Sequence, residues 1–380
     1  MDDGTRATRE GTRRYARRMI RQGIHPDHFR DDGRLTYSSV GLGTYLGNSD
    51  ARTDRMVEAA VIRAVASGCN VIDTAINYRC QRGERAVGNA LRAATEKGIV
   101  RRDEIIFSTK GGYLPFDGKP PVDPTLYFSE TFLRNGLLAP NDIVAGCHAM
   151  TPSYIQDQMD RSRRNLGLSS IDIYYLHNPE TQLQEVSRKE FLTRIRKVFV
   201  TLEDNVSQGK VGVYGAATWD GYRVPPTAKG HLSLSELVDA AKEIGGTAHH
   251  FRVIQLPYNL AMPEALAEPT QRVGSETVCL LEAADRLGVY VMTSAPLYQG
   301  RLSRKLPALL NDVFPGLQTD AQRAIQFVRS TPKLGTALVG MKTTSHVEEN
   351  LNVAAISPAP VEQFMKLFSV PDGSLGTGEK

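Results

Sequence analysis

Cysteine and tryptophan are scarce in this chain of 380 residues, and long apolar runs are missing. The four cysteines, Cys69, Cys80, Cys147 and Cys279, are scattered, without the paired spacing of a zinc site or the density of a disulfide framework. No run approaches eighteen apolar residues, and the first residues contain no apolar signal core. We therefore expect a cytoplasmic protein with reduced thiols, no bound metal and no membrane span.

Charge is also modest, at +4 overall. Such a weak balance does not indicate a nucleic acid or a membrane surface as partner. The first stretch is rich in arginine, and a mitochondrial presequence is the rival interpretation, which its early acidic residues oppose. We expect instead a solvated helix face that docks on the rest of the protein through Tyr15, Met19 and Ile20.

Short β-rich runs alternate with stretches of helical period between residues 35 and 355. The expected strands are Ser39–Tyr45, Asn70–Thr74, Glu104–Lys110, Ile171–His177, Lys210–Ala216, Arg252–Leu256, Val289–Ser294 and Thr336–Gly340. The expected helices are Thr53–Ala66, Arg82–Lys97, Pro152–Leu166, Lys189–Ser207, Ser233–Ile244, Ser275–Arg286, Thr319–Arg329 and Ser345–Ala355. Eight βα units favour an α/β fold of the closed (β/α)8 TIM-barrel type over an open, doubly wound sheet.

The expected organisation is a basic N-terminal arm (1–34), the barrel (35–370) and a flexible tail (371–380). A last helical stretch is expected at Pro360–Phe368. The connection from Gly111 to Thr151, after the third strand, is far longer than a usual βα loop and is rich in proline and aromatic residues. A loop of that length on the catalytic rim of a barrel usually covers or shapes a pocket.

Three of the expected strands end in a titratable residue: Asp73, Lys110 and His177. Tyr78 follows Asp73 after one short turn. Because the C-terminal rim of a parallel barrel faces a cavity, these four side chains are predicted to meet there. A phenol has a pKa of about 10 and needs a nearby cation to act as an acid at neutral pH, so we expect Lys110, held by Asp73, to lower the pKa of Tyr78.

In such a site Tyr78 donates a proton to an oxygen that develops negative charge, and neutral His177 orients the same oxygen. Carbonyl reduction needs this pair, provided that a cofactor delivers a hydride. A purely structural Lys110–Asp73 ion pair is the plainer interpretation, and it weakens once Tyr78 and His177 are considered with it.

Several motifs resemble the signature of the aldo-keto reductase superfamily and occur in chain order over most of residues 35–355. They are Asn70-Val-Ile-Asp-Thr-Ala-Ile-Asn-Tyr78, Gly83-Glu84, Val87-Gly88, Ser108-Thr-Lys110, Ile171-Asp-Ile-Tyr-Tyr-Leu-His177-Asn-Pro179, Gly209-Lys210, Gln255-Leu-Pro-Tyr-Asn259, Ala295-Pro-Leu297, Gly340-Met-Lys342 and Glu348-Glu-Asn350. The resemblance implies an NAD(P)H-dependent oxidoreductase that interconverts a carbonyl and an alcohol.

By that resemblance, Tyr78 is the general acid, Lys110 and Asp73 tune it, and His177 orients the carbonyl. The resemblance places Gln255 on the nicotinamide carboxamide, Lys342 and Thr343 on the adenosine 2'-phosphate, and Glu349 and Asn350 on the adenine. The full set of cofactor residues that it implies is Ala217, Thr218, Gln255, Ser294, Pro296, Leu297, Gly340, Lys342, Thr343, His346, Glu349 and Asn350. No GxGxxG fingerprint stands in a strand-turn-helix context, so a Rossmann site is not indicated.

Four positions, at three places in the chain, depart from the family pattern. Ala217-Thr218 replaces the usual Ser-Asn, Ser294 replaces a tyrosine that stacks on the nicotinamide, and His346 replaces an arginine near the 2'-phosphate. Lys342, just before a helix N-terminus, still favours NADP(H) over NAD(H).

Two other functions stay open at this point: a Schiff-base lyase that uses Lys110, and a non-catalytic barrel that senses nicotinamide redox state. The first is disfavoured because Asp73 holds the lysine charged. The expected partner is a small carbonyl or alcohol substrate, and the sequence indicates no oligomeric state. His148 beside Cys147 has no second pair of ligands in sequence and is interpreted as a loop histidine, not a metal ligand.

Overall fold

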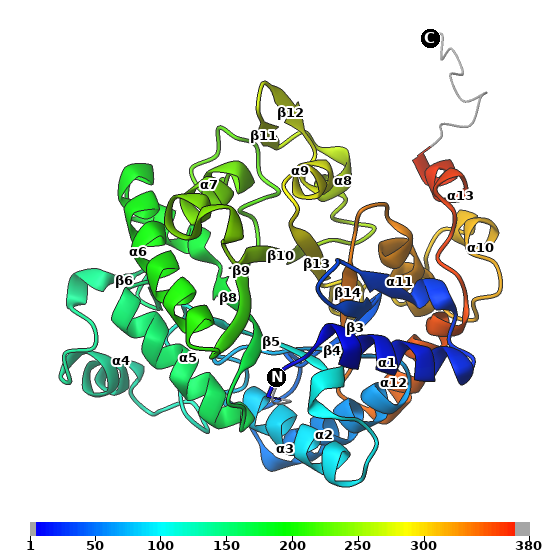
Figure 1. Ribbon diagram of the computed structural model, residues 1–380, viewed down its shortest axis with the longest axis horizontal. Helices are drawn as coiled ribbons and strands as arrows, with labels where there is room; N and C mark the ends of the chain where they lie inside the picture. Colours follow the sequence, from blue (N-terminus) through cyan, green and yellow to red (C-terminus); the bar gives the residue numbers. More distant parts are fainter. Residues whose placement is uncertain (1–4, 369–380) are drawn as a thin grey trace, which may run out of the picture.

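Eight parallel strands close into a barrel at the centre of the computed structural model, which describes residues 5–368 (Figure 1). Around the barrel they are β3 (Val40–Gly43), β4 (Val71–Asp73), β5 (Ile106–Gly111), β8 (Ile171–His177), β9 (Val211–Ala217), β10 (Phe251–Pro257), β13 (Tyr290–Ser294) and β14 (Thr336–Gly340). Each strand pairs with the next in chain order, and β14 pairs with β3. The eight predicted strands and the closed barrel are confirmed.

The inside of the barrel explains where the titratable residues lie. A cluster that includes Val71, Ile106, Ile173 and Val253 fills its lower part. Because side chains alternate between the two faces of a strand, residues two or four positions further along point to the same side. Asp73, Lys110, His177 and Gln255 stand at those positions, and they therefore form the top layer of the barrel interior.

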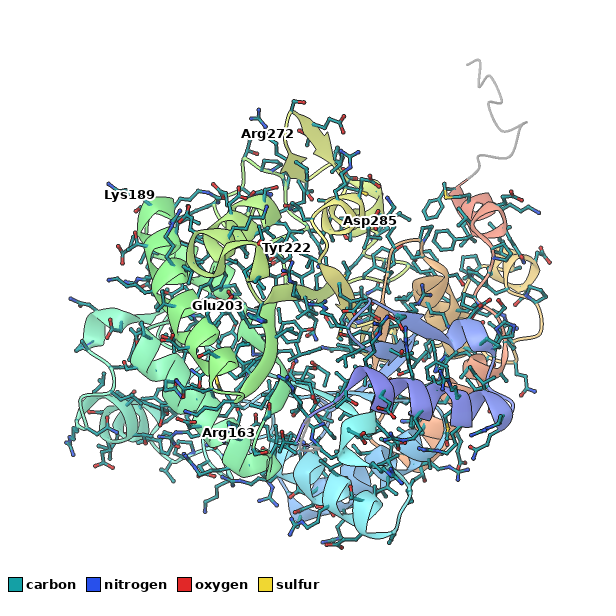
Figure 2. All side chains as sticks on the ribbon, viewed as in Figure 1. Arg163, Lys189, Glu203, Tyr222, Arg272 and Asp285 are labelled. Carbon is teal, nitrogen blue, oxygen red and sulfur yellow. The ribbon has the colours of Figure 1, made fainter. Side chains whose placement is uncertain are left out.

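The outer ring of helices follows the expected order. It consists of α2 (Ala51–Ala66), α3 (Arg82–Glu96), α5 (Pro152–Leu166), α6 (Arg188–Ser207), α7 (Leu234–Gly245), α9 (Leu280–Arg286), α11 (Asp320–Ser330) and α12 (Thr344–Leu351). A second cluster of buried apolar residues includes side chains from these helices and from the outer face of the barrel wall. Figure 2 shows side chains filling the space between helices and strands, with Lys189 and Arg272 at the periphery.

Two of the expected helices need correction. The helix expected at Ser275–Arg286 is wrong in its first part, where β12 (Glu276–Val278) pairs with β11 (Gln271–Val273) and α9 begins only at Leu280. Gly274, at a φ of 61°, supplies the left-handed turn of that hairpin. The helix expected at Ser345–Ala355 is α-helical only to Leu351 and ends as the 3-10 turn Asn352–Ala355.

The N-terminal arm packs on the barrel. It contains α1 (Arg9–Arg21) and a hairpin of β1 (Phe29–Asp31) and β2 (Thr36–Ser38). Tyr15 and Met19 are buried as predicted, and the Tyr15 hydroxyl donates to the Val65 carbonyl at 2.8 Å. Ile20 is only half-buried.

Part of the arginine face is paired and not solvated, because Arg14 and Arg18 bind the buried Glu104 at 3.0 and 2.7 Å. Glu104 lies just before β5, so the arm covers the N-terminal end of the barrel, opposite the rim at which Asp73, Lys110 and His177 lie. The division at residue 34 stays a prediction, and the tail 371–380 lies outside the described residues.

The long connection after β5 forms a compact insertion. It contains α4 (Pro124–Phe128), a π-helical turn (Ser129–Leu133), a 3-10 turn (Pro140–Asp142) and a hairpin of β6 (Ile143–Val144) and β7 (His148–Ala149), and it projects from the side of the barrel near α5 (Figure 1). Its aromatic residues pack mainly on one another, with Phe116 stacked on Phe128 at 5.0 Å and Phe132 buried against Tyr154.

Shorter elements complete the fold: α8 (Glu264–Ala267), α10 (Leu309–Val313) and α13 (Val361–Met365), with short 3-10 turns that include the final Lys366–Phe368. The helix α13 and the final turn together confirm the helical stretch predicted at Pro360–Phe368. Phe364 anchors α13 by stacking on Phe327 at 5.4 Å. Within residues 5–368, no helix is both long and apolar enough to cross a membrane.

Candidate active site

A buried ion pair lies at the top of the barrel interior. The Lys110 ammonium donates to Asp73 Oδ2 at 2.6 Å and to the Thr74 carbonyl at 2.8 Å. The other oxygen of Asp73 accepts from the Ser108 hydroxyl at 2.7 Å and from the Gln255 amide at 3.0 Å. Burial lowers the pKa of Lys110, and the adjacent carboxylate opposes that shift. Two oxygen acceptors on the ammonium favour its charged form.

Tyr78 stands next to this pair. Lys110 Nζ lies 5.0 Å from the centre of the phenol ring, and the ring of Tyr45 packs edge-on at 5.1 Å. Burial, with a further contribution from the negative charge of Asp73, raises the pKa of Tyr78 well above its usual value of 10.0. The expected lowering of the Tyr78 pKa is therefore wrong, and Tyr78 is a protonated donor at neutral pH.

The turn after Tyr78 is left-handed at three consecutive residues, with φ of 49° at Arg79, 57° at Cys80 and 66° at Gln81. Non-glycine residues are uncommon in this region and persist where the surroundings hold them. The buried Arg79 guanidinium pairs with Asp54 of α2 at 2.6 Å, and a backbone N–H of the insertion donates to the Cys80 carbonyl at 2.9 Å. Both contacts tie the end of this turn to the surrounding fold.

His177 completes the group. Its ring centre lies 5.9 Å from that of Tyr78, edge-on. Burial, with the charge of Lys110, lowers the pKa of His177 well below 6.5, so the imidazole is neutral at physiological pH. Its Nδ1 atom is buried and has no hydrogen-bond partner among residues 5–368. Nε2 is therefore the ring nitrogen available to a ligand.

A cleft of about 870 Å³ opens above these side chains. Asp73, Tyr78 and His177 line it, whereas Lys110 is fully buried beneath. The predicted cofactor residues that line the cleft are Ala217, Thr218, Gln255, Ser294, Pro296, Leu297, Gly340, Lys342, His346, Glu349 and Asn350. Thr343 is not in this lining; as the N-cap of α12, its hydroxyl accepts from the His346 backbone N–H at 3.3 Å.

The cleft is also lined by residues outside the expected catalytic and cofactor set. Tyr45 and Trp219 stand at its mouth with 59% and 43% of their surface exposed, so both are accessible to a ligand. Tyr45 was expected to end the first strand, but β3 ends at Gly43, so Tyr45 lies in the loop that follows. Trp219 follows the fifth strand, and for this residue the sequence leaves two interpretations equally open, a pocket wall and a rim residue packed under the next loop. The further lining residues from loops include Asn77, Tyr113, Asn178, Gln299, Ser303 and Arg304.

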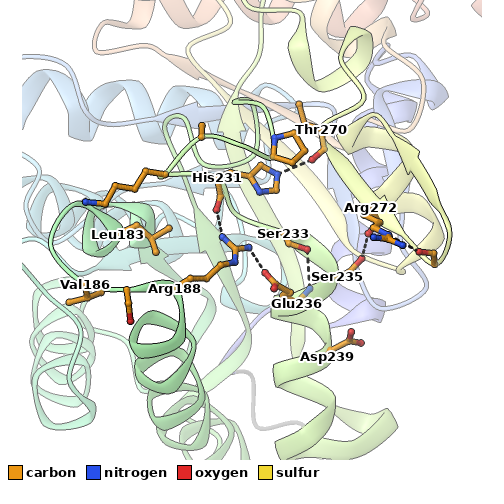
Figure 3. Close-up of a pocket in the computed structure, with 15 residues that line it drawn as sticks. Leu183, Val186, Arg188, His231, Ser233, Ser235, Glu236, Asp239, Thr270 and Arg272 are labelled. Atoms are coloured by element: carbon orange, nitrogen blue, oxygen red, sulfur yellow. Dashed lines mark hydrogen bonds and ion pairs between the residues drawn. The ribbon is translucent and has the colours of Figure 1, made fainter.

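A second cavity, of about 790 Å³, lies on the flank of the barrel, between the start of α6, the start of α7 and the β11–β12 turn (Figure 3). Its cationic side chains have protein partners. Arg188 donates to the His231 carbonyl at 2.8 Å and pairs with Glu236, while Lys229 donates to the Gln184 carbonyl at 2.8 Å. The combination of phenol, imidazole and buried ion pair is found at the barrel mouth and not in this groove.

No group of three or more histidine, cysteine or acidic side chains could hold a metal ion in the part of the chain that the structure describes. His148 instead lies buried in the insertion, with its ring nitrogens directed at the His177 carbonyl and the Gln182 amide. His148 was expected in a loop, and the structure places it on the short strand β7 within the long connection after β5. The sequence did not indicate its contact with the strand that carries His177.

The chain matches the family model described as "Aldo/keto reductase family" over residues 39–308. Among curated proteins it is similar to the NADH-specific methylglyoxal reductase of Escherichia coli, with 28% identity over 49% of this chain and 50% of that protein. It is also similar to the aldo-keto reductase yakc [NADP(+)] of Schizosaccharomyces pombe, with 25% identity over 48% of this chain and 41% of the relative. The matched segments thus span half or less of these relatives.

Solved structures resemble the whole barrel. An aldo/keto reductase from Klebsiella pneumoniae, solved with NADP and acetate, aligns with a TM-score of 0.58 and 19% identity over 89% of this chain and 94% of that one. The aldo-keto reductase AKR11C1 of Bacillus halodurans, in its holo form, aligns with a TM-score of 0.59 and 20% identity over 88% and 93% of the two chains. At these identities the likeness supports the fold.

Proposed function

The chain belongs to the aldo/keto reductase family, and from that membership we propose that it is an oxidoreductase that reduces a carbonyl group with a nicotinamide cofactor. One observation carries the proposal: Tyr78, His177 and the Lys110–Asp73 pair meet at one end of a cleft of about 870 Å³. A proton donor and a neutral hydrogen-bond donor beside one another suit an oxygen that gains negative charge.

In the proposed reaction the Tyr78 hydroxyl gives its proton to the substrate oxygen, and the His177 Nε2–H donates a hydrogen bond to the same oxygen. The Lys110 cation, 5.0 Å from the phenol ring, then stabilises the negative charge that develops on Tyr78. Because burial raises the Tyr78 pKa, the phenol is protonated at neutral pH and has a proton to give.

The cleft fits a nicotinamide cofactor by its volume of about 870 Å³ and by its polar groups. When bound, the cofactor supplies the hydride. The Gln255 NH2 group donates to Asp73, which can only accept, so the amide oxygen of Gln255 is left to accept from the carboxamide. The Thr218 hydroxyl is buried without a partner among the described residues, and it is suited to bind the same group.

The far end of the cleft favours NADP(H) over NAD(H). Lys342 lies just before α12, and Arg304 comes from the loop after β13; both line the cleft. The N-terminus of α12 beside Lys342 is a favourable environment for the 2'-phosphate, and Arg304 adds a second cation to the lining of the cleft. The relatives above are named for either cofactor, so the preference is argued from these two side chains.

The substrate half of the cleft is walled by aromatic rings. Tyr45, Tyr113 and Trp219 line it together with the amides of Asn77 and Asn178. Rings and amides suit a small, neutral carbonyl compound with an apolar or ring-shaped body. The cytoplasmic location stays a prediction.

A Schiff-base mechanism is disfavoured by the position of Lys110. Its side chain has no exposed surface, and its ammonium is bound to Asp73 and to the Thr74 carbonyl. A substrate carbonyl in the cleft has no access to this nitrogen, and the lysine is held charged, whereas an attacking amine must be neutral.

The experiment is a titration of the purified protein with NADPH and with NADH, followed by cofactor fluorescence, and then a carbonyl panel assayed for NADPH oxidation. We expect tighter NADPH binding, and Lys342→Met should weaken it by about 10- to 100-fold while leaving NADH affinity nearly unchanged. Lys97→Met, a change at an exposed residue at the other end of the barrel, is the control. Absence of binding to either cofactor contradicts the proposal, and tight binding without turnover would favour the redox-sensing barrel.

A further inference from the structure

His148 connects the insertion to the strand that carries His177. It is buried, with 1% of its surface exposed, and it sits on β7. Its Nε2 atom lies 2.8 Å from the His177 carbonyl oxygen, and its Nδ1 atom lies 2.8 Å from the Gln182 side-chain nitrogen. Both ring nitrogens are therefore in hydrogen bonds inside the protein.

The direction of these hydrogen bonds is set by a residue on α6. Arg194 lies 2.6 Å from Gln182 Oε1, and a guanidinium can only donate, so the amide oxygen must face Arg194. The amide NH2 then faces His148 and donates to Nδ1. His148 accordingly carries its proton on Nε2, which donates to the His177 carbonyl.

The ring stays neutral at neutral pH, because burial lowers the pKa of His148 to about 4. The hydrogen bonds above then select the tautomer. A doubly protonated ring could no longer accept from Gln182. The polar groups that face His148 from the neighbouring elements are the Gln182 amide and the His177 carbonyl, and the ring of Tyr113 packs edge-on at 5.2 Å.

The His177 ring has little else to hold it. No group in residues 5–368 bonds its buried Nδ1. Tyr113 packs edge-on against it at 5.1 Å, and the Tyr113 hydroxyl accepts from Asn178 at 3.0 Å. The insertion thus contacts both the ring and the backbone of His177. Gly112 makes this approach possible, since a Cβ there would lie 2.7 Å from His148 Nε2 and 2.9 Å from the His177 oxygen.

We propose that His148 is a positioning residue: its Nε2–H, directed by Gln182 and Arg194, fixes the backbone of His177 and with it the imidazole that faces the substrate. The proposal rests on the role given to His177 above. The insertion then has a structural role at the site, because its residues Tyr113 and His148 both hold His177 in place.

The kinetic test compares two replacements of His148. His148→Leu removes the donor, whereas His148→Gln places an amide N–H near the position of Nε2. We expect His148→Leu to lower kcat by about 10- to 100-fold, because small displacements of a catalytic group cost that much, with NADPH affinity unchanged. His148→Gln should recover most of the lost kcat. Equal loss in both variants, or full kcat in His148→Leu, would overturn the proposal.

A spectroscopic test needs no turnover. Selective 15N-histidine labelling reports the tautomer of each imidazole by NMR, and His148→Gln identifies the His148 signals. We expect a neutral ring protonated at Nε2 from pH 5 to pH 8, and a loss of this single tautomer in Arg194→Met, a change at the far end of the chain of hydrogen bonds. The His177 ring signals should shift in His148→Leu and not in the surface control Lys189→Met.

The two tests separate this proposal from the proposed function. Wild-type protein that is inactive on every carbonyl, yet has His148 protonated at Nε2 and His177 signals that respond to His148→Leu, would refute the reductase and leave the support intact. A His148 protonated at Nδ1, or His177 signals that ignore His148→Leu, would refute the support whatever the activity.

Discussion

Replacing Lys110 with methionine removes the cation of a buried ion pair and leaves the carboxylate. Asp73 has 6% of its side chain exposed and would keep only Ser108 and Gln255 as donors, both on one oxygen. Breaking a buried pair in this way costs about 3–5 kcal/mol. Total stabilities are about 5–15 kcal/mol, so Lys110→Met should lose a large share of its free energy of unfolding at pH 7.

The loss should depend on pH. In the variant, folding favours a protonated Asp73, whereas the unfolded chain ionises this side chain above about pH 4. The folded state then binds more protons than the unfolded state, so stability falls as pH rises, by up to about 1.4 kcal/mol per unit. The double variant Asp73→Asn/Lys110→Met has no buried charge at this position and should recover much of the stability without this slope.

The assay is urea unfolding of wild type, both single variants and the double variant, at pH 5, 6, 7 and 8. A double-mutant cycle from these data isolates the coupling between the two side chains. The reasoning fails if Lys110→Met unfolds within about 1 kcal/mol of wild type at pH 7, or if its stability does not fall with rising pH.

Three further changes test other contacts. Gly112→Ala should lower the free energy of unfolding by about 2–3 kcal/mol, because the added Cβ would lie 2.9 Å from the His177 carbonyl oxygen. Gly118→Ala, whose Cβ meets open space, should lose only about 1 kcal/mol, and thermal unfolding compares the two variants. Burial raises the pKa of Glu180 to about 7, so the contribution of this side chain to stability should fall by about 2–3 kcal/mol as pH rises from about 4.5 to 7, and the stability difference between wild type and Glu180→Gln should change by that amount. Urea unfolding of both proteins at several pH values measures this difference. Tyr15→Ala should lose about 3–5 kcal/mol and the exposed Arg17→Ala less than about 0.5 by the same assay, unless the arm is dispensable.

The barrel was predictable because its signals are local. Each strand is a short apolar run, and strand ends in a parallel barrel converge on one rim, so Asp73, Lys110 and His177 could be brought together before any geometry was known. The helix expected from Ser275 failed for a local reason as well. A glycine turn between β11 and β12 competes with helical period, and Gly274 at a positive φ decides it.

What the sequence could not provide comes from contacts between distant loops. The link from His148 to His177 spans 29 residues, and Gln182 joins it from beyond β8. The Tyr78 pKa was expected to fall, because the cation is visible in the sequence, whereas the extent of burial is not. Trp219 likewise sits in a loop without a periodic pattern, so the sequence left its place in the wall of the cleft undecided.

The most direct test of the central claim is a single-turnover measurement of hydride transfer from 4-deuterated NADPH to a carbonyl that the wild type reduces. Wild type and Tyr78→Phe are compared at saturating cofactor, with NADPH affinity measured separately. The account predicts deuterium in the wild-type alcohol and a rate in Tyr78→Phe that is lower by about 100-fold or more, with cofactor affinity nearly unchanged. A Tyr78→Phe variant that transfers deuterium at the wild-type rate would contradict the role given to Tyr78.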